Sequence, residues 1–212
     1  MKGTINMLIK TLVVGQIETN CYVITDEATR ECAIIDPGAD SNAILNYIED
    51  NRLTPRAVFI THGHFDHTMA LPEVLAQTGG VPVYIHAREL ETDGRSASHL
   101  RAVPDLRFYA EGDEIKIGSL VFRVLETPGH TRGGVTILCG DAMFSGDTLF
   151  HGSCGRTDLG GDMELMLESL RRLSALDGDF EVYPGHAETT TLENERRSNY
   201  YVRYANSDFP DQ

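Results

Sequence analysis

Short apolar runs separated by turn residues divide the chain into strands and helices. Runs rich in β-branched and aromatic residues predict strands over 7–14, 21–25, 31–36, 57–60 and 82–86 in the first half, with helices over 40–51 and 68–77. The second half opens with strands instead. There we predict strands over 114–117, 120–126, 135–138, 142–145 and 180–183, and helices over 162–176 and 188–204.

This order of elements indicates an α/β protein in which two mixed β-sheets pack together and helices cover their outer faces. The second-half helix over 162–176 repeats apolar residues on one side, as a helix that covers a sheet should. No linker interrupts the pattern, so we expect residues 1–212 to form a single domain. The polar stretch 91–104 is the least regular, and we expect a surface helix and loop there of the kind that often borders a site.

Composition narrows the class of protein. Hydrophobic residues make up 41% of the 212-residue chain, which favours a globular fold over disorder. No apolar run approaches the ~18 residues that span a membrane, and the first ten residues lack the apolar core of a signal peptide, so we expect a cytoplasmic protein. The net charge of -14 argues against nucleic acid as a partner. We expect a small-molecule substrate, and nothing in the pattern indicates an oligomeric state.

Four cysteines are present, none of them in a C-x-x-C pair. Without a secretion signal we expect free thiols rather than disulfides. Cys21, Cys32 and Cys139 stand in apolar strand-like runs and should be core residues. Cys154 differs because it lies among glycines, where it could line a site.

Candidate chemistry concentrates in four short stretches, which together contain five histidines and two aspartates. They are residues 61–67 (THGHFDH), 127–130 (TPGH), 145–148 (SGDT) and 183–186 (YPGH), and each follows an apolar run. Ligands of α/β proteins collect at the carboxyl ends of strands, so we expect these stretches to meet in one cleft. A glycine in each stretch, at 63, 129, 146 and 185, should allow the chain to turn sharply.

Imidazole and carboxylate together form sites for first-row metals, and seven such groups suffice for two divalent ions. His62 and His64, two residues apart, can face one metal, while Asp66 and His67 face a second, and the two oxygens of Asp147 can bridge both. The resulting first site is His62, His64, His130 and Asp147, and the second is Asp66, His67, His186 and Asp147. Zn is the first expectation, and Fe or Mn would also suit these ligands. A bridging hydroxide, whose pKa would fall toward ~7, would balance the remaining positive charge.

Three further residues are candidates for weaker roles. Asp36 could hold a metal-bound imidazole by its other nitrogen. His86 ends a predicted strand and should only cap that edge, while His99, in the polar stretch, should be solvated.

The motif in residues 61–67, supported by Pro128-Gly129-His130, Gly146-Asp147 and Pro184-Gly185-His186, resembles the metallo-β-lactamase superfamily. The resemblance covers nearly the whole chain, and it implies an αββα sandwich and the same seven metal ligands. Residues 145–150 and 152–158 resemble the glyoxalase II group, which implies hydroxyacylglutathione hydrolase activity. The sequence ends soon after the His186 motif, so it resembles short bacterial glyoxalase II-like proteins without the C-terminal helical domain that helps to bind glutathione.

The leading hypothesis is therefore a metal-dependent hydrolase of thioesters such as S-2-hydroxyacylglutathione, with the bridging hydroxide attacking the acyl carbon. Asp66 would be catalytic, as a ligand of the second metal that orients the hydroxide. Arg156 could pair with a substrate carboxylate or with Asp158, and Cys154 and His151 could also touch substrate.

Two alternatives remain open at this point. Residues 155–158 (GRTD) also resemble persulfide dioxygenases, which use one iron. The second alternative is a non-catalytic metal-binding domain, although the complete set of ligands argues against it. The acidic charge disfavours a nuclease, and the missing secretion signal disfavours a β-lactamase.

Overall fold

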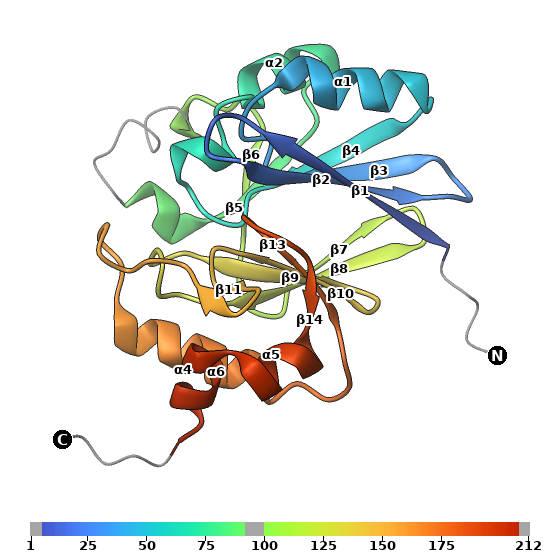
Figure 1. Cartoon of the computed structure of the whole chain (residues 1–212). Helices are drawn as coiled ribbons and strands as arrows, with labels where there is room; N and C mark the ends of the chain where they lie inside the picture. The colour runs from blue at the N-terminus through green and yellow to red at the C-terminus, as the bar shows by residue number, and fades with distance from the viewer. Residues whose placement is uncertain (1–5, 92–99, 208–212) are drawn as a thin grey trace.

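The computed structural model describes residues 6–91 and 100–207. Two six-stranded sheets face each other, and helices lie on the outer side of each sheet, giving four layers in the order α, β, β, α (Figure 1). The sequence-based prediction of two mixed sheets flanked by helices is therefore confirmed. Within the described residues, no helix has both the length and the apolar character needed to cross a membrane.

The first sheet has the strand order β1-β2-β3-β4-β5-β6. β1 to β3 pair antiparallel, and β3 to β6 pair parallel. These strands are β1 (Met7–Val14), β2 (Thr19–Asp26), β3 (Glu31–Ile35), β4 (Thr54–Phe59), β5 (Val83–His86) and β6 (Leu106–Tyr109). Parallel neighbours need crossover connections, and the elements in these connections are α1 (Ser41–Asp50), α2 (Leu71–Gln77) and the short 3-10 helices η1 (Phe65–His67) and η2 (Ala87–Leu90).

The second sheet has the order β14-β13-β10-β9-β8-β7 and is antiparallel except where β10 meets β13. Its strands are β7 (Glu114–Ile117), β8 (Leu120–Glu126), β9 (Val135–Cys139), β10 (Ala142–Gly146), β13 (Glu181–Pro184) and β14 (Thr190–Thr191). A small hairpin of β11 (Leu149–Phe150) and β12 (Ser153–Cys154) follows β10. The outer helices are α4 (Met163–Ser174), α5 (Leu192–Ser198) and α6 (Tyr200–Ala205).

Three apolar clusters hold these layers together. Successive side chains of a strand point to opposite faces of the sheet, so neighbouring residues contribute to different clusters. On β2, Cys21 and Val23 pack beneath the outer helices, whereas Tyr22 and Ile24 face the second sheet. The third cluster joins the second sheet to α4, α5 and α6 through residues such as Leu170. Each large side chain that is fully buried contributes about 1.5–3 kcal/mol. All four cysteines are free, and the three expected in the core, Cys21, Cys32 and Cys139, are buried there.

The terminal segment differs from the prediction of one helix over 188–204, which is wrong. The structure instead has the short strand β14 and two helices that meet at Asn199. The Asn199 backbone is extended, and its side-chain oxygen accepts hydrogen bonds from the backbone N–H groups of Tyr201 and Val202. An asparagine that satisfies the first amides of the next helix in this way ends the preceding helix.

Two further predictions concern the start of α2 and the polar stretch 91–104. The helix expected over 68–77 begins only at Leu71, after a turn. The irregular stretch 91–104 lies partly outside the described residues, and His99 with it, so the predictions made for them remain predictions.

Candidate metal centre

The four stretches rich in histidine and aspartate meet at one edge of the two sheets. His62 follows β4, His130 follows β8, Asp147 follows β10 and His186 follows β13. β8, β10 and β13 run in the same direction, because β9 is antiparallel to both of its neighbours and β13 is parallel to β10. Their carboxyl ends therefore share one edge, and the predicted convergence is confirmed.

One group contains three histidines from two loops. His62 Nε2 lies 3.1 Å from His64 Nδ1, and His130 Nε2 lies 2.8 Å from the same His64 atom. One nitrogen from each ring lies within 4.8 Å of the others, which is close enough for all three to bind a single ion.

A second group lies beside the first and contains Asp66, His67 and His186. Asp66 Oδ2 is 3.5 Å from His67 Nε2 and 3.2 Å from His186 Nε2. Asp147 lies between the two groups. One of its oxygens is 3.5 Å from His67 Nε2, and the other is 3.3 Å from His130 Nε2. The carboxylate of Asp147 thus faces both groups at once.

The hydrogen bonds around the rings determine which nitrogens face the centre. The carbonyl oxygen of Arg156 can only accept, so His130 Nδ1 must donate to it, across 2.5 Å. Asp36 Oδ2 accepts from His67 Nδ1 at 3.0 Å, as expected for Asp36. In a neutral ring, a protonated Nδ1 leaves Nε2 with a lone pair.

His62 follows the same rule through Thr61. Thr61 Oγ1 donates its hydrogen to Asp36 Oδ2 at 2.6 Å, so it accepts from His62 Nδ1 at 3.2 Å. When the rings are neutral, the Nε2 lone pairs of His62, His67 and His130 are therefore all directed into the centre.

These donors fit a divalent metal ion. Among the described residues only four buried side-chain N or O atoms lack a hydrogen-bond partner, and two of them are His67 Nε2 and Asp147 Oδ1. A buried polar atom without a partner is costly, and it is expected where an ion or water binds. Imidazole nitrogen and carboxylate oxygen are the ligands that Zn, Fe and Mn share.

Burial and crowding give the metal-free centre an uneven distribution of protons. Burial, together with the nearby histidines, lowers the pKa of His62 well below its ordinary range and that of His64 to about 4. Burial also opposes charge on His67, but the carboxylates of Asp147 and Asp36 outweigh it and raise the His67 pKa to about 9. Burial would raise the pKa of Asp66, yet the hydrogen bond from His186 and the charge of His67 lower it. A metal ion would therefore displace a proton from His67.

The glycines of the four stretches serve two different purposes. Gly129 and Gly146 have positive φ angles of 148° and 49°, as the prediction of sharp turns requires. Gly185 does not have a positive φ, and its role is close approach. A Cβ at this position would lie 2.2 Å from Asp147 Oδ1 and 2.8 Å from His67 Cε1.

The three residues predicted to touch substrate lie on or beside the β11–β12 hairpin. The Arg156 side chain makes two 2.7 Å hydrogen bonds to Asp158, and both side chains are exposed. Of the two partners expected for Arg156, the structure therefore shows Asp158. Cys154 is half-buried, and burial raises its pKa to about 11. His151 is exposed, and its Nδ1 lies 3.8 Å from Glu188 Oε2.

Sequence reasoning missed several polar residues that support the centre. Thr19 Oγ1 donates to Asp66 Oδ2 at 3.0 Å. The amide of Asn20 donates to the carbonyl oxygens of Pro184 and Ala187, which flank the His186 loop. Glu89, a buried acid, accepts from the loops of the first group. In the sequence, these residues appear only as polar residues beside apolar ones. Such a pattern does not indicate which distant residue each of them will contact.

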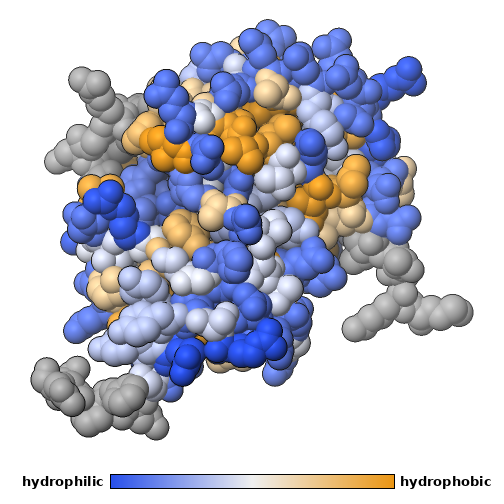
Figure 2. Space-filling view, viewed as in Figure 1, coloured by the Kyte–Doolittle hydropathy of each residue, from blue (hydrophilic) through white to orange (hydrophobic). Residues whose placement is uncertain are grey.

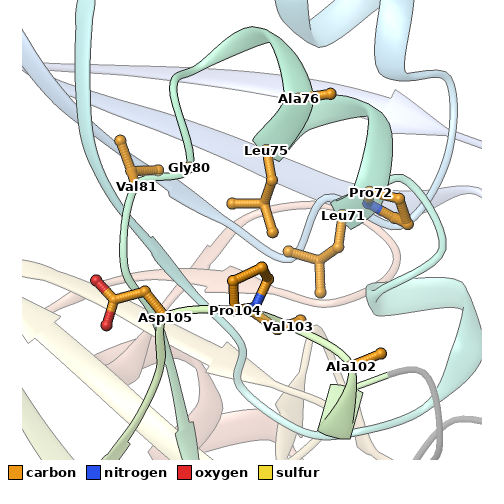
Figure 3. Close-up of a pocket in the computed structure, with 10 residues that line it drawn as sticks. All are labelled: Leu71, Pro72, Leu75, Ala76, Gly80, Val81, Ala102, Val103, Pro104 and Asp105. Carbon is orange, nitrogen blue, oxygen red and sulfur yellow. The ribbon is translucent and has the colours of Figure 1, made fainter.

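The structure also has a cavity that is separate from the centre. A mostly apolar cavity of about 370 Å³ lies between α2 and residues 102–105 (Figure 3). Leu71 and Leu75 point from α2 toward Pro104, and none of the seven candidate ligands lines this cavity. Asp105, its one ionisable lining residue, is already paired with Arg107.

Apolar side chains are also exposed next to the motif. Phe65 and Met69 are 52% and 59% exposed, and Val13 near the end of β1 and Ile17 in the β1–β2 connection are similarly open. Figure 2 shows hydrophobic side chains gathering on the upper part of the visible face, over the first sheet, in a surface that is otherwise mainly hydrophilic.

Comparison with known proteins agrees with this geometry. The family model described as the metallo-beta-lactamase superfamily matches residues 14–186. The hydroxyacylglutathione hydrolase GloC of Haemophilus influenzae is 32% identical over 210 residues, covering 92% of this chain and 98% of GloC. Among solved structures, the BLEG-1 B3 metallo-beta-lactamase superposes with a TM-score of 0.82 at 33% identity, covering 92% of this chain and 99% of the other. TTHA1623 in a di-iron-bound form gives 0.79 at 33% identity, with 91% and 99% covered.

Proposed function

The chain belongs to the metallo-β-lactamase superfamily, and we propose that within it this protein is a metal-dependent hydrolase of thioesters. The observation that carries the proposal is the meeting of two ligand groups around Asp147, with unpartnered buried atoms directed between them. The similarity to GloC supports S-2-hydroxyacylglutathione as the class of substrate. The acidic charge of the chain favours such a small molecule over nucleic acid.

We assign two divalent ions to the seven ligands. His62, His64 and His130 would hold one, Asp66, His67 and His186 the other, and Asp147 would contact both. The di-iron form of TTHA1623 supports a pair of ions in this fold. Zn is the first expectation, with Fe or Mn as substitutes.

The bound ions would supply a Lewis acid for the acyl carbonyl and a nucleophilic water near neutral pH. The chain's own residues hold the ligands for that task. Asp36 and the Arg156 carbonyl orient two imidazole rings, and Thr19 orients Asp66. Asp66 would in turn align the water for attack. A thiolate is a good leaving group, so this reaction does not need a strong proton donor from the chain.

The β11–β12 hairpin and the residues after it would bind the rest of the substrate. Arg156 is exposed, and its only charged partner among the described residues is the equally exposed Asp158. Exposed ion pairs are weak, so a substrate carboxylate can replace Asp158 on the guanidinium. Phe150 brings the hairpin to the centre, since its ring lies 6.1 Å from that of His186. His151 and Cys154 of the same hairpin would contact substrate rather than react with it.

The direct test is hydrolysis of S-lactoylglutathione by protein loaded with Zn, Mn or Fe. Activity should disappear with EDTA and return with metal, and His64→Ala should bind less metal and lose most turnover. Arg56→Ala changes an exposed residue that pairs with Glu31 and is not one of the seven ligands, so this control should keep its activity. Full activity in the absence of any metal would end the proposal.

Metal content separates this function from the two alternatives. A persulfide dioxygenase would contain one iron per chain and consume oxygen with glutathione persulfide, whereas two ligand groups that share Asp147 favour a pair of ions. A non-catalytic domain would bind metal yet leave esters, thioesters, lactones and phosphodiesters intact.

A further inference from the structure

Glu89 is a buried carboxylate that the proposed hydrolysis does not use. It lies in η2 just after β5, and only 6% of it is exposed. Its Oε2 accepts a hydrogen bond from the backbone N–H of Gly63 at 2.6 Å, and its Oε1 accepts one from Gly133 at 2.8 Å. Burying a carboxylate is costly, so this position calls for an explanation.

The two amides belong to the loops that carry the first ligand group. Gly63 stands between His62 and His64, and Gly133 lies three residues after His130. One carboxylate thus ties together the two chain segments from which all three imidazoles project. Both hydrogen bonds are short, at 2.6 and 2.8 Å, and together they hold the two segments against one side chain.

Both positions are glycine, and the structure shows why. A Cβ on Gly63 would lie 2.8 Å from Glu89 Oε2, and one on Gly133 would lie 2.7 Å from Oε1. No side chain fits between the carboxylate and either backbone. The acid and the two glycines therefore form one packed unit behind the ligands.

We infer that Glu89 is a positioning residue that sets how tightly His62, His64 and His130 hold their ion. The inference rests on the proposed metal centre. Ligand nitrogens bind an ion strongly only when the surrounding contacts already hold them in place. Removal of contacts that orient ligands lowers metal affinity by about 10- to 100-fold. The hydrogen bonds from Gly63 and Gly133 connect Glu89 to the segments of the first ligand group, so the second ion should feel the change less.

The chain offers a matched control in Asp26. This carboxylate is 1% exposed and accepts from the backbone N–H groups of Ala28 at 2.9 Å and Ser119 at 2.6 Å. A Cβ on Gly118 would lie 2.2 Å from Asp26 Oδ2, so it too packs against a glycine. Asp26 ends β2, and Thr19, which contacts Asp66, begins it, so the control lies at the opposite end of the strand.

The experiment titrates Co²⁺ into metal-free wild-type protein, Glu89→Gln and Asp26→Asn, following visible absorption and competition with a chromophoric chelator. Glu89→Gln should lower the affinity for one of the two ions by about 10- to 100-fold and change the absorption spectrum of that ion. The affinity for the other ion should stay within about threefold of the wild-type value. Asp26→Asn should keep both affinities within the same threefold, even if its melting temperature falls.

A Glu89→Gln protein with wild-type affinities and spectrum would overturn the inference, as would equal weakening of both ions or the same change in Asp26→Asn. Glu89→Asp keeps the charge but is too short to reach both amides, and it should give an intermediate loss. This variant decides the matter if Glu89→Gln does not fold, and unchanged affinity in it would also count against the inference. Wild-type protein that binds no ion would refute the metal centre itself, whereas failure to cleave thioesters would leave this result standing.

Discussion

Replacement of Asp36 by asparagine tests the support beneath the centre. Asp36 is 2% exposed, and its two oxygens accept three hydrogen bonds. Oδ1 accepts from Thr61 N at 2.8 Å, while Oδ2 accepts from Thr61 Oγ1 at 2.6 Å and from His67 Nδ1 at 3.0 Å. In Asp36→Asn one oxygen becomes an NH₂ group, and in either orientation it faces a donor.

The size of the effect follows from that mismatch. A buried donor left without its acceptor costs about 1–3 kcal/mol. At 1.4 kcal/mol per tenfold, a loss that falls on the metal-bound state weakens binding by about 5- to 140-fold. The ion at Asp66, His67 and His186 should show most of it, because Asp36 holds the His67 ring. Competition titration with Zn²⁺ and a chromophoric chelator measures this, with Asp26→Asn as the control. A folded Asp36→Asn protein with wild-type affinity for both ions would refute the reasoning.

The same variant has a pH signature in the metal-free protein. The His67 pKa is raised from 6.5 to about 9, so the protonated ring stabilises the fold fully below about pH 6.5, and this contribution is lost as pH rises through about 9. Asp36→Asn removes one of the charges that raise the pKa, so its stability should fall less over this interval. Urea unfolding at several pH values measures the difference, and parallel profiles for the two proteins would contradict the assigned cause.

Three further outcomes can be checked independently. Gly185→Ala places a Cβ 2.2 Å from Asp147 Oδ1 and should cut turnover by about 100-fold through displaced ligands; kinetics at wild-type level would show that the contact relaxes freely. The Cys154 pKa is raised from 9.0 to about 11, so its alkylation by iodoacetamide at pH 8 should be about 100-fold slower than that of an ordinary thiol. The rate should increase up to about pH 11, and a pH-independent rate would contradict this. Glu195→Gln disturbs a fully buried carboxylate that accepts from Gly152 N at 2.8 Å, so urea unfolding should show a loss of about 1–3 kcal/mol, and unchanged stability would count against that contact.

The candidate ligands were predictable because each lies directly after a strand with a clear apolar pattern. His62, His130, Asp147 and His186 each follow a different strand, and the rule that ligands collect at the carboxyl ends of strands was enough to bring them together. The very short strands β11, β12 and β14 were not predicted, because two residues carry no period. β6 has four residues, as some predicted strands do, but it was missed because the exposed Arg107 interrupts its apolar run.

Other features depend on contacts that no local pattern contains. The break at Asn199 was missed because both flanking helices carry charged and apolar residues in continuous helical spacing, while the capping bonds that divide them are a property of the folded chain. Glu89 was missed because its partners, Gly63 and Gly133, are 26 and 44 residues away. Asp36 was found because it follows a strand as the ligands do, although its bonds to Thr61 could not be foreseen. The extent of the domain and the cytoplasmic location remain predictions.

The number of metal ions per chain tests the central claim most directly. Protein purified without added metal, then reconstituted and freed of excess ion, would be analysed by inductively coupled plasma mass spectrometry against its protein concentration. The meeting of the two ligand groups around Asp147 predicts two ions per wild-type chain. A ratio of one, with no second ion at saturating metal, would contradict the paired centre and favour the mononuclear iron alternative.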